Sequence, residues 1–446
     1  MDKIDSSISV ISDCTYPTPL KFAGRDSTAA IRYRRDSDRI HIFPCSRGGE
    51  EHATAPTFER AGPREFITGD PSRMTAAILT CGGLCPGLND VIRGLVMSLS
   101  HHYGVKKILG VRYGYAGLVP NGHSPLELTP ENVDDIHRDG GTILGTSRGR
   151  QDVPASVQTL LDWKVNLLFI IGGDGTQRGA LELAEEFKRL DAPVAVIGIP
   201  KTIDNDIMWV DQSFGFDTAV QIAARVVNDA HVEAKSAERC IGVVKVMGRD
   251  SGFIASNAAL ASLEANVVLI PEVPFSLHET DGLLDFLEQR IRENDHAVIV
   301  VAEGAGQEHF GKNSDAAITD ASGNKQHQDI GDLLCEKIQQ HFELKQHPVN
   351  IKYLDPSYSV RSASASSTDR IYCTRLAHSA VHAAMAGKTG MMVSRWSGCF
   401  AHIPLGMVTR GRRKIDPTGS LWRTVLEATG QPCLSNGAHP AQQPHS

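Results

Sequence analysis

Short, uninterrupted apolar runs recur along the middle of this chain, at residues 76–79, 165–171, 194–199, 241–246, 267–270 and 296–301. Each run gives way to glycine, proline or acidic residues. Hydrophobic side chains that follow one another without alternation are typical of strands buried on both faces of a sheet. Because helical periodicity lies between the runs, strand and helix alternate along the chain, which predicts an α/β fold with parallel sheets.

The clearest helical pattern lies after Asp217, which we expect to cap the helix N-terminus. Its apolar stripe consists of Ala219, Ile222, Ala223, Val226 and Ala230. Parallel α/β sheets bind ligands at the carboxyl ends of their strands. The loops that follow the apolar runs are therefore the first candidates for a functional site.

The two ends of the chain have a different composition. Residues 1–73 are rich in Asp, Arg and Ser and show no sustained periodicity, so we expect an N-terminal arm or extension. Residues 431–446 are polar and contain proline, and we expect a disordered tail.

Composition excludes several classes of function. A net charge of −7 argues against a nucleic-acid partner and against an anionic membrane. No apolar run approaches the roughly 20 residues that a membrane-spanning helix needs. The first residues carry acids where a signal peptide would carry bases. We therefore expect a soluble enzyme or binding protein without membrane contact.

Cysteine usage indicates the compartment. The nine cysteines are scattered and odd in number, so a disulfide framework is not expected. Cys81 and Cys85 lie four residues apart, but no second Cys/His pair stands at zinc spacing, which favours two small buried residues over a zinc site. A reduced, cytoplasmic location fits this pattern best.

Three polar clusters follow the apolar runs. The first is the sequence TCGGLCPGLN at residues 80–89, which follows the first run. Its glycines let backbone amides approach a phosphate, and a helix that starts near Asn89 offers its positive end. A simple tight turn explains this cluster equally well.

The second cluster is GGDGTQRG at residues 172–179. Gly173 and Gly175 are spaced as in dinucleotide-binding loops, but Asp174 between them would repel a bare pyrophosphate. A phosphate that carries magnesium would be attracted to Asp174 instead of repelled, because the cation attracts the carboxylate. The cluster therefore predicts a site for a magnesium-bound phosphate.

The third cluster is PKTIDND at residues 200–206. Asp204 and Asp206 stand beside Thr202 and Lys201. One carboxylate could take the proton of an attacking hydroxyl while the other orients a metal ion or water. An Asx-rich turn is the alternative interpretation.

These clusters and several others occur in the order found in phosphofructokinases. The further matches are GYAGL at 114–118, GTILGTSR at 141–148, VMGR at 246–249, AEG at 302–304, YSVR at 358–361 and DR at 369–370. The chain resembles this family from about residue 74 to residue 420. Local matches at 245–255 and 353–357 are similar to the long-form ATP-using enzymes of plants and trypanosomatids.

The resemblance implies catalytic roles. Asp204 would be the general base for the 1-hydroxyl of fructose 6-phosphate, and Asp174 would hold Mg²⁺ on the donor phosphates with help from Asp206. Thr202 would face the transferring phosphoryl group, and Arg148 and Arg249 would balance its charge. The implied ATP contacts are Gly83, Tyr115, Arg148, Gly149, Gly173, Asp174, Gly175 and Thr176.

The resemblance also implies the acceptor contacts, which are Thr202, Ile203, Asp204, Met247, Gly248, Arg249, Glu303, Lys352, Tyr358 and Arg361. Glu303 would accept hydrogen bonds from fructose hydroxyls, and Tyr358 and Arg361 would hold the 6-phosphate. Lys352 stands where many relatives carry an arginine from a neighbouring subunit. Cys240, with Arg239 adjacent, stands where bacterial-type relatives carry a phosphate-binding arginine, and Arg225 and Lys245 are possible substitutes.

Gly175 and Lys201 bear on the phosphoryl donor. Pyrophosphate-using relatives typically carry aspartate in place of this glycine and a lysine before the Thr-Ile-Asp sequence, so this chain combines one feature of each type. A carboxylate at position 175 would lie where the α-phosphate of a nucleotide must pass. Glycine leaves room there, so we expect ATP, and pyrophosphate is the alternative.

The resemblance implies two Rossmann-like domains with the active site in the cleft between them, in a homotetramer under allosteric control. We expect a larger ATP-binding domain at 74–215 and 360–405 and a smaller fructose-6-phosphate domain at 216–359 and 406–430. The implied reaction is a step of glycolysis. Alternatives are a non-catalytic regulatory subunit and a relative of NAD or lipid kinases that shares only the GGDGT loop.

Overall fold

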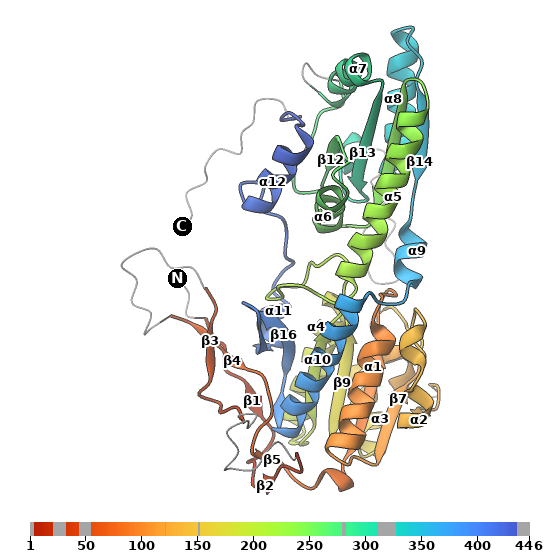
Figure 1. Ribbon diagram of the computed structural model, residues 1–446. Helices are drawn as coiled ribbons and strands as arrows, with labels where there is room; N and C mark the ends of the chain where they lie inside the picture. Colours follow the sequence, from red (N-terminus) through yellow and green to blue (C-terminus); the bar gives the residue numbers. More distant parts are fainter. Residues whose placement is uncertain are drawn as a thin grey trace. The chain divides into compact units, whose positions relative to one another are not determined.

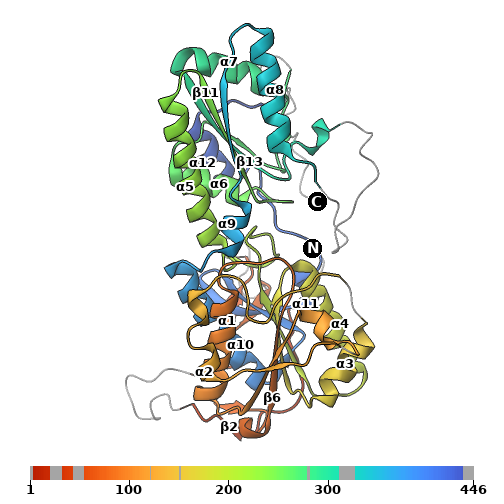
Figure 2. The same cartoon turned by 90° about the vertical axis from the view of Figure 1, so that its right-hand side faces the viewer.

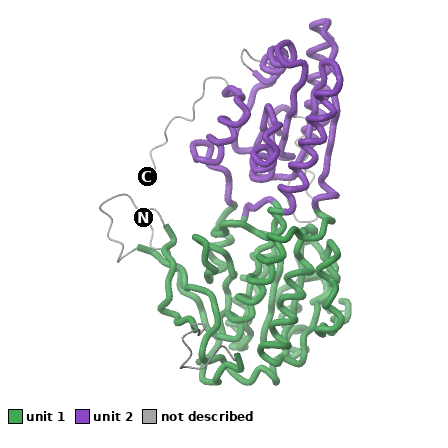
Figure 3. Tube along the Cα trace, in the orientation of Figure 1, with its two compact units in different colours: residues 1–203, 207–217, 361–412 green, residues 204–206, 218–360, 413–446 purple. Residues whose placement is uncertain are grey.

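The computed structural model describes residues 4–20, 33–43, 55–120, 122–149, 152–278, 282–310 and 327–434. Its trace divides into two compact units, which Figure 3 colours separately. The larger unit comprises residues 1–203, 207–217 and 361–412, and the smaller unit comprises 204–206, 218–360 and 413–446. Most of the expected tail, from residue 435 onward, lies outside the described residues.

The larger unit is built on one nine-stranded mixed sheet (Figure 1). The strands, in their order across the sheet, are β3 (Arg39–His41), β4 (Thr57–Arg60), β17 (Cys399–Pro404), β16 (Met391–Trp396), β10 (Ala195–Pro200), β9 (Leu167–Gly172), β6 (Thr75–Thr80), β7 (Lys107–Val111) and β8 (Leu126–Glu127). The five strands from β16 to β7 are parallel, and the outer strands are antiparallel. The predicted α/β class is confirmed.

Helices cover both faces of this sheet, which explains the uninterrupted apolar runs. Figure 2 shows α1 and α10 on one face and α3, α4 and α11 on the other. These helices are α1 (Leu88–Met97), α3 (Val153–Asp162), α4 (Asp174–Arg189), α10 (Ser367–Met385) and α11 (Leu405–Val408). Every residue of β6, β9 and β10 is buried.

Parts of the N-terminal stretch belong to the larger unit. β4 pairs with β17 and β3 pairs with β4, so both extend the main sheet. Two short ladders join β1 (Ser9–Val10) to β15 (Lys388–Thr389) and β2 (Tyr16–Pro17) to β5 (Phe66–Ile67). Where the composition suggested an arm, the described residues between 4 and 73 include short strands, and two of these, β1 and β4, pair with strands near the C-terminal end of the chain.

A buried ionic cluster fixes β4 to the rest of the larger unit. The carboxylate of Glu59, which is only 3% exposed, accepts hydrogen bonds from Arg64 at 2.7 Å, Lys388 at 3.1 Å and His402 at 3.0 Å. Burial alone would raise the pKa of Glu59, but the hydrogen bonds and charges of His402 and Lys388 outweigh it and lower the pKa to about 2. The stability that this shift contributes is complete above about pH 4.5 and is lost as pH falls toward 2.

The smaller unit contains a four-stranded parallel sheet with helices on both faces (Figure 2). Its strands, in sheet order, are β12 (Val267–Leu269), β13 (His296–Ala302), β11 (Cys240–Val246) and β14 (Asn350–Leu354). Its helices are α5 (Phe216–Ser236), α6 (Phe253–Ser262), α7 (Leu283–Asn294), α8 (Ile330–Leu344), α9 (Ser357–Ser362) and α12 (Ser420–Thr429). Alternate residues of β11, β12 and β13 form one core with α7 and α8. No helix among the described residues is long and apolar enough to cross a membrane.

The start of α5 differs from the sequence-based expectation. The helix begins at Phe216, so Asp217 lies in its first turn instead of capping it. The Asp217 carboxylate accepts a hydrogen bond from the Ser366 hydroxyl at 2.7 Å, and this distant partner is invisible in the local sequence. Within the predicted stripe, Ala219, Ala223 and Ala230 are fully buried.

Glu59→Gln should lower the free energy of unfolding by about 1–3 kcal/mol, because buried Lys388, Arg64 and His402 lose their shared carboxylate and, among the described residues, only Asp36, which contacts Lys388 and Arg64, still compensates their charge. Thermal unfolding monitored by circular dichroism measures the effect. Glu127→Gln, which changes an exposed carboxylate, is the matched control and should unfold like the wild type. Equal midpoints for both variants would show that the cluster contributes nothing to stability.

Candidate active site

Three loops meet at the carboxyl edge of the main sheet, where β6, β9 and β10 end. The Cys81 amide donates to the carbonyl of Ile171 at 3.0 Å, and the Lys201 amide donates to the carbonyl of Gly172 at 3.0 Å. The Lys201 ammonium donates to the carbonyl of Gly83 at 2.6 Å. The sequence clusters at 80–89, 172–179 and 200–206 therefore contact one another around Lys201.

A fourth loop joins them. The Gly82 amide donates to the carbonyl of Ser147 at 3.1 Å, and the Thr146 hydroxyl donates to the carbonyl of Gly82 at 2.6 Å. These bonds place Arg148 beside the glycine loop, and a Cβ on Gly83 would lie 3.6 Å from an Arg148 Nη. Arg148 and Gly149 are exposed, so both can reach a ligand.

The N-terminus of α4 faces this edge. Asp174 is the first residue of the helix, and the capping residue Gly173 has no side chain to satisfy the first amides. Unpaired amides and the positive end of the helix dipole attract anions such as phosphate. Gln177 is fully buried and donates to the carbonyls of Gly172 at 3.0 Å and Ile199 at 3.1 Å, so it fastens two of the loops. Sequence reasoning did not single out Gln177.

The two oxygens of Asp174 have different surroundings. Oδ2 accepts a hydrogen bond from Arg178 and lies 3.7 Å from Nε of Arg412. Oδ1 is buried and has no hydrogen-bond partner among the described residues. A buried carboxylate oxygen without a partner is costly unless a ligand satisfies it, and carboxylate oxygens are the ligands that Mg²⁺ prefers. Asp174 therefore fits the magnesium role that the sequence analysis gave it.

Tyr115 and Gly175 both lie at the first turn of α4, but Tyr115 is packed against it while Gly175 is surrounded by open space. The Tyr115 hydroxyl donates to the carbonyl of Thr176 at 2.8 Å, and burial raises its pKa well above the ordinary value. Tyr115 thus supports the first turn of α4. Gly175 is exposed, and a Cβ built there would meet nothing within 4 Å. The protein itself would tolerate a side chain at position 175.

Lys201 is a buried cation. Burial lowers its pKa, the nearby thiols of Cys85 and Cys81 act in the opposite direction, and the charges of Arg148 and Arg361 lower it further. Both cysteines are buried, as the sequence analysis expected. The edge of the sheet in the larger unit is thus positively charged, which suits a polyphosphate donor.

The carboxylates at 204 and 206 belong to the smaller unit, where backbone contacts hold them. The Ser251 hydroxyl donates to the carbonyl of Asp204 at 3.1 Å, and the Arg413 amide donates to the carbonyl of Asp206 at 2.7 Å. Asn205 between them has a left-handed backbone with φ of 56°. This turn projects two half-buried carboxylates from one short segment.

The ends of β11 and β13 place the next two motifs side by side. The Glu303 amide donates to the carbonyl of Val246 at 2.9 Å, and the Gly304 amide donates to that of Gly248 at 3.1 Å. Glycine is required at 304, because a Cβ there would lie 1.8 Å from the carbonyl oxygen of Arg249. The Met-Gly-Arg and Ala-Glu-Gly sequences therefore form one surface on the smaller unit.

The predicted phosphate contacts lie around β14 and α9. Lys352 is exposed on β14, which is an edge strand, and Tyr358 is 86% exposed on α9. Arg361, near the end of the same helix, is assigned to the larger unit. Exposed side chains on an edge strand are available to a ligand or a second chain.

The candidate substitutes for the missing arginine differ in their surroundings. Cys240 is buried, and Arg225 is exposed on α5. Lys245 forms ion pairs with Asp329 and, at 3.0 Å, with Asp355. Burial lowers the pKa of Lys245, but hydrogen bonds with Asp329 and its neighbours outweigh this effect and raise the pKa above its ordinary value. Lys245 therefore belongs to a local ionic cluster, which favours Arg225 as the substitute.

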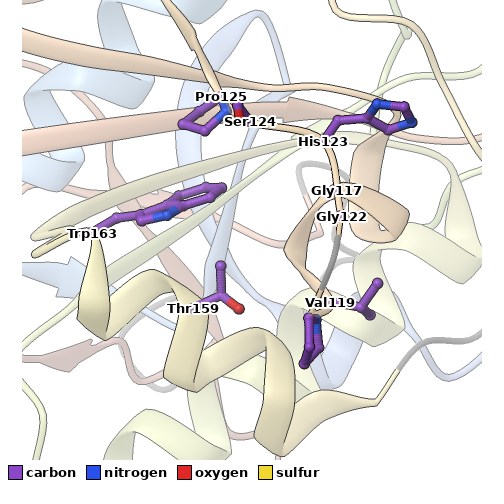
Figure 4. A pocket seen from close by; sticks show the side chains of 9 residues that line it. Gly117, Val119, Gly122, His123, Ser124, Pro125, Thr159 and Trp163 are labelled. Atoms are coloured by element: carbon purple, nitrogen blue, oxygen red, sulfur yellow. The ribbon is translucent and has the colours of Figure 1, made fainter.

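Two other features do not match phosphate or metal chemistry. A pocket of about 260 Å³ lies next to the GYAGL turn (Figure 4). Thr159 of α3 and Trp163, which caps the C-terminus of this helix, line one side, and a loop that contains His123 lines the other. None of the described residues that line it is Lys, Arg, Asp or Glu. Asp285, Glu288 and His341 could converge on a metal ion, but Glu288 already contacts His341 at 3.2 Å, Lys345 at 3.1 Å and Arg292.

Comparison with known proteins identifies the family. The family model described as "Phosphofructokinase" matches residues 75–384. The chain belongs to the phosphofructokinase family. This finding confirms the resemblance on which the site residues were predicted.

Several members of the family are similar to this phosphofructokinase over most of its length. The ATP-dependent 6-phosphofructokinase of Borreliella burgdorferi is 46% identical, over 97% of this chain and 98% of its own. The ATP-dependent 6-phosphofructokinase 7 of Arabidopsis thaliana is 49% identical, over 84% and 77%. The Trypanosoma cruzi ATP-dependent 6-phosphofructokinase is 46% identical, over 88% and 82%. The expected likeness to plant and trypanosomatid enzymes is confirmed.

Solved structures support the fold of this phosphofructokinase. The pyrophosphate-dependent phosphofructokinase of Marinobacter aquaeolei superposes with a TM-score of 0.67, at 21% identity, and covers 81% of this chain and 92% of its own. At this identity the likeness concerns the fold and does not bear on the donor.

Asp174→Asn should raise the Mg²⁺ concentration for half-maximal rate by about tenfold or more, because an amide offers one neutral oxygen in place of a carboxylate. A magnesium titration of the initial rate measures this. Glu185→Gln changes an exposed acid on the same helix and should leave the titration unchanged. An unaltered magnesium requirement in Asp174→Asn would remove Asp174 from the metal site.

Proposed function

We propose that this chain is an ATP-dependent 6-phosphofructokinase, which transfers the γ-phosphoryl group of Mg-ATP to the 1-hydroxyl of fructose 6-phosphate. The products are fructose 1,6-bisphosphate and ADP. The observation that carries this proposal is the near full-length similarity to relatives named ATP-dependent 6-phosphofructokinase. The positively charged loop edge around Lys201, with the unpartnered Oδ1 of Asp174, supports it independently.

In the proposed reaction the larger unit binds the donor. The first amides of α4 and the Thr176 hydroxyl contact the phosphates, and Arg148 and Lys201 balance their charge. Magnesium held by Asp174, with Asp206 assisting, would neutralise charge on the β- and γ-phosphates. Gly83, Gly149 and Gly173 let the backbone approach the nucleotide.

In the same reaction most of the acceptor contacts come from the smaller unit, and Arg361, Thr202 and Ile203 of the larger unit complete them. Asp204 accepts the proton of the 1-hydroxyl as its oxygen attacks the γ-phosphorus, and Arg249 stabilises the charge that develops on the phosphoryl oxygens. Glu303 and the Met247–Gly248 backbone orient the sugar. Tyr358, Arg361 and Lys352 bind its 6-phosphate, and Thr202 and Ile203 line the path between donor and acceptor.

ATP is favoured over pyrophosphate by the open space at Gly175. Because a Cβ at this position would meet no protein atom within 4 Å, the glycine is not demanded by packing. A requirement of the ligand explains it better, since a side chain here would face the phosphates at the start of α4. Lys201 suits either donor, and a pyrophosphate-dependent enzyme remains the rival.

A non-catalytic subunit and a NAD or lipid kinase are weaker candidates. The former would not need the combination of Asp174, Asp204 and Arg148, and the latter would not need Glu303 and the Tyr358–Arg361 pair. The homotetramer, the allosteric control and the cytoplasmic location stay predictions. A coupled assay of the purified protein with ATP and then with pyrophosphate tests the proposed reaction most directly. Turnover with pyrophosphate alone would overturn the donor assignment.

Asp204→Asn should lower kcat by about two orders of magnitude or more, the usual scale for a lost general base. The affinity for ATP should hardly change, because the base acts on the acceptor. Steady-state kinetics with both substrates measure this, and Asp229→Asn on the exposed face of α5 is the control. Near-normal kcat in Asp204→Asn would remove it from the assigned role.

Gly175→Asp should reduce kcat/KM with ATP by at least about a hundredfold, equivalent to about 2.7 kcal/mol. Two unit charges about 4 Å apart repel by roughly 4 kcal/mol at an effective dielectric constant near 20. The kcat/KM with pyrophosphate should fall much less, because pyrophosphate lacks the α-phosphate contact.

The variant should fold like the wild type, because position 175 is open and an acid in the first helical turn is favourable. Gly175→Ala adds bulk without charge, so comparing it with Gly175→Asp separates the steric effect from the charge repulsion. ATP turnover that survives in Gly175→Asp at wild-type efficiency would show that Gly175 is a turn residue only.

A further inference from the structure

Arg412 lies in a segment that was expected to belong to the smaller domain, and its side chain was given no role. It is the last residue of the larger unit and forms an isolated antiparallel bridge with Ile207. Ile207 is 2% exposed and belongs to the hydrophobic core of the larger unit, together with Met407 and Val408. The backbone at 412 is therefore anchored to the core beside the segment that follows Lys201 and Thr202.

The side chain of Arg412 reaches the predicted magnesium ligand. Its Nε lies 3.7 Å from Oδ2 of Asp174, and 27% of the side chain is exposed. The same oxygen accepts a hydrogen bond from Arg178, so two guanidinium groups flank one carboxylate oxygen. At 3.7 Å the Arg412 contact is an ion pair that is too long for a hydrogen bond.

Arg178 and Arg412 place two guanidinium groups around the predicted magnesium ligand. Arg148 and Arg361 act on nearby Lys201, and their effect is to lower its pKa, as expected where cations crowd together. A polyphosphate is attracted to a group of cations of this kind. A divalent cation on Asp174 would in addition repel both guanidinium groups from that carboxylate.

We propose that Arg412 is a donor-binding residue, whose guanidinium leaves Asp174 for the phosphate oxygens of the nucleotide when magnesium binds the carboxylate. This inference rests on the proposed function. A guanidinium matches two phosphate oxygens at once, and the partial exposure of Arg412 leaves its planar end able to turn toward them. The rigid anchor at Ile207 limits that movement to the side chain.

Arg412→Ala tests the proposal. Titration calorimetry with ADP in the presence of Mg²⁺ should show an affinity loss of about tenfold or more, the scale of a lost charge-assisted contact. The KM for ATP should rise by a similar factor, while the KM for fructose 6-phosphate stays within about twofold. Arg412→Lys should recover part of the ADP affinity, because lysine keeps the positive charge but cannot bind two phosphate oxygens at once as a guanidinium does. Arg410→Ala, at an exposed position two residues away, should match the wild type.

Two further results would decide against the proposal or against the function on which it rests. Unchanged ADP affinity in Arg412→Ala, with a lower kcat or a higher magnesium requirement, would make Arg412 a positioning residue for Asp174. If the alanine variant does not fold, Arg412→Gln keeps the polar contact without the charge and must show the same loss of ADP affinity. Wild-type protein that binds ADP but shows no phosphofructokinase activity would refute the proposed function, and the calorimetry would still decide whether Arg412 binds the nucleotide.

Discussion

The parallel pairing of β6, β9 and β10 is the constraint on which the donor site depends. Thr80 lies opposite Ile171, and Gly172 lies opposite Pro200, so the three strands end at the same edge. Their loops therefore leave the sheet together, although they are far apart in the sequence. A slip of one residue would turn every side chain of a strand to the opposite face, where it would have to pack against different helices, and close packing of the core disfavours this. The core thus sets the geometry of the loops.

At this edge the structure places Lys201 close to the glycine loop, and Arg178 and Arg412 close to the carboxylate of Asp174. Lys201 is held by the carbonyl of Gly83, and the amides of the first turn of α4 point away from the helix body. Asp174 shares Oδ2 between Arg178 and Arg412, while Oδ1 keeps its lone pairs for a ligand. This division is compatible with the proposed role of Asp174 as a magnesium ligand beside phosphates. The space beside Gly175 is open, because a Cβ at this position would meet no atom within 4 Å.

Local sequence was a good guide wherever function depends on loops that directly follow strands. The apolar runs became the buried strands, and the glycine-rich and acidic clusters lie where strands end. Contacts between distant residues were not predictable. The Asp217 carboxylate binds Ser366 instead of capping α5, and Lys245 forms ion pairs with Asp329 and Asp355. A run of sequence carries no signal for a partner that approaches from another part of the chain.

The sequence by itself determined the α/β class, the family and the residue types of the catalytic loops, because strand burial and backbone approach to phosphate require particular residues at fixed spacings. Only the tertiary structure decided that described N-terminal segments pair with the main sheet, that Gln177 fastens two loops and that Arg412 stands beside Asp174. The physical reason is that an ion pair or a strand pairing depends on distance in space, and the packing of the core brings these residues together.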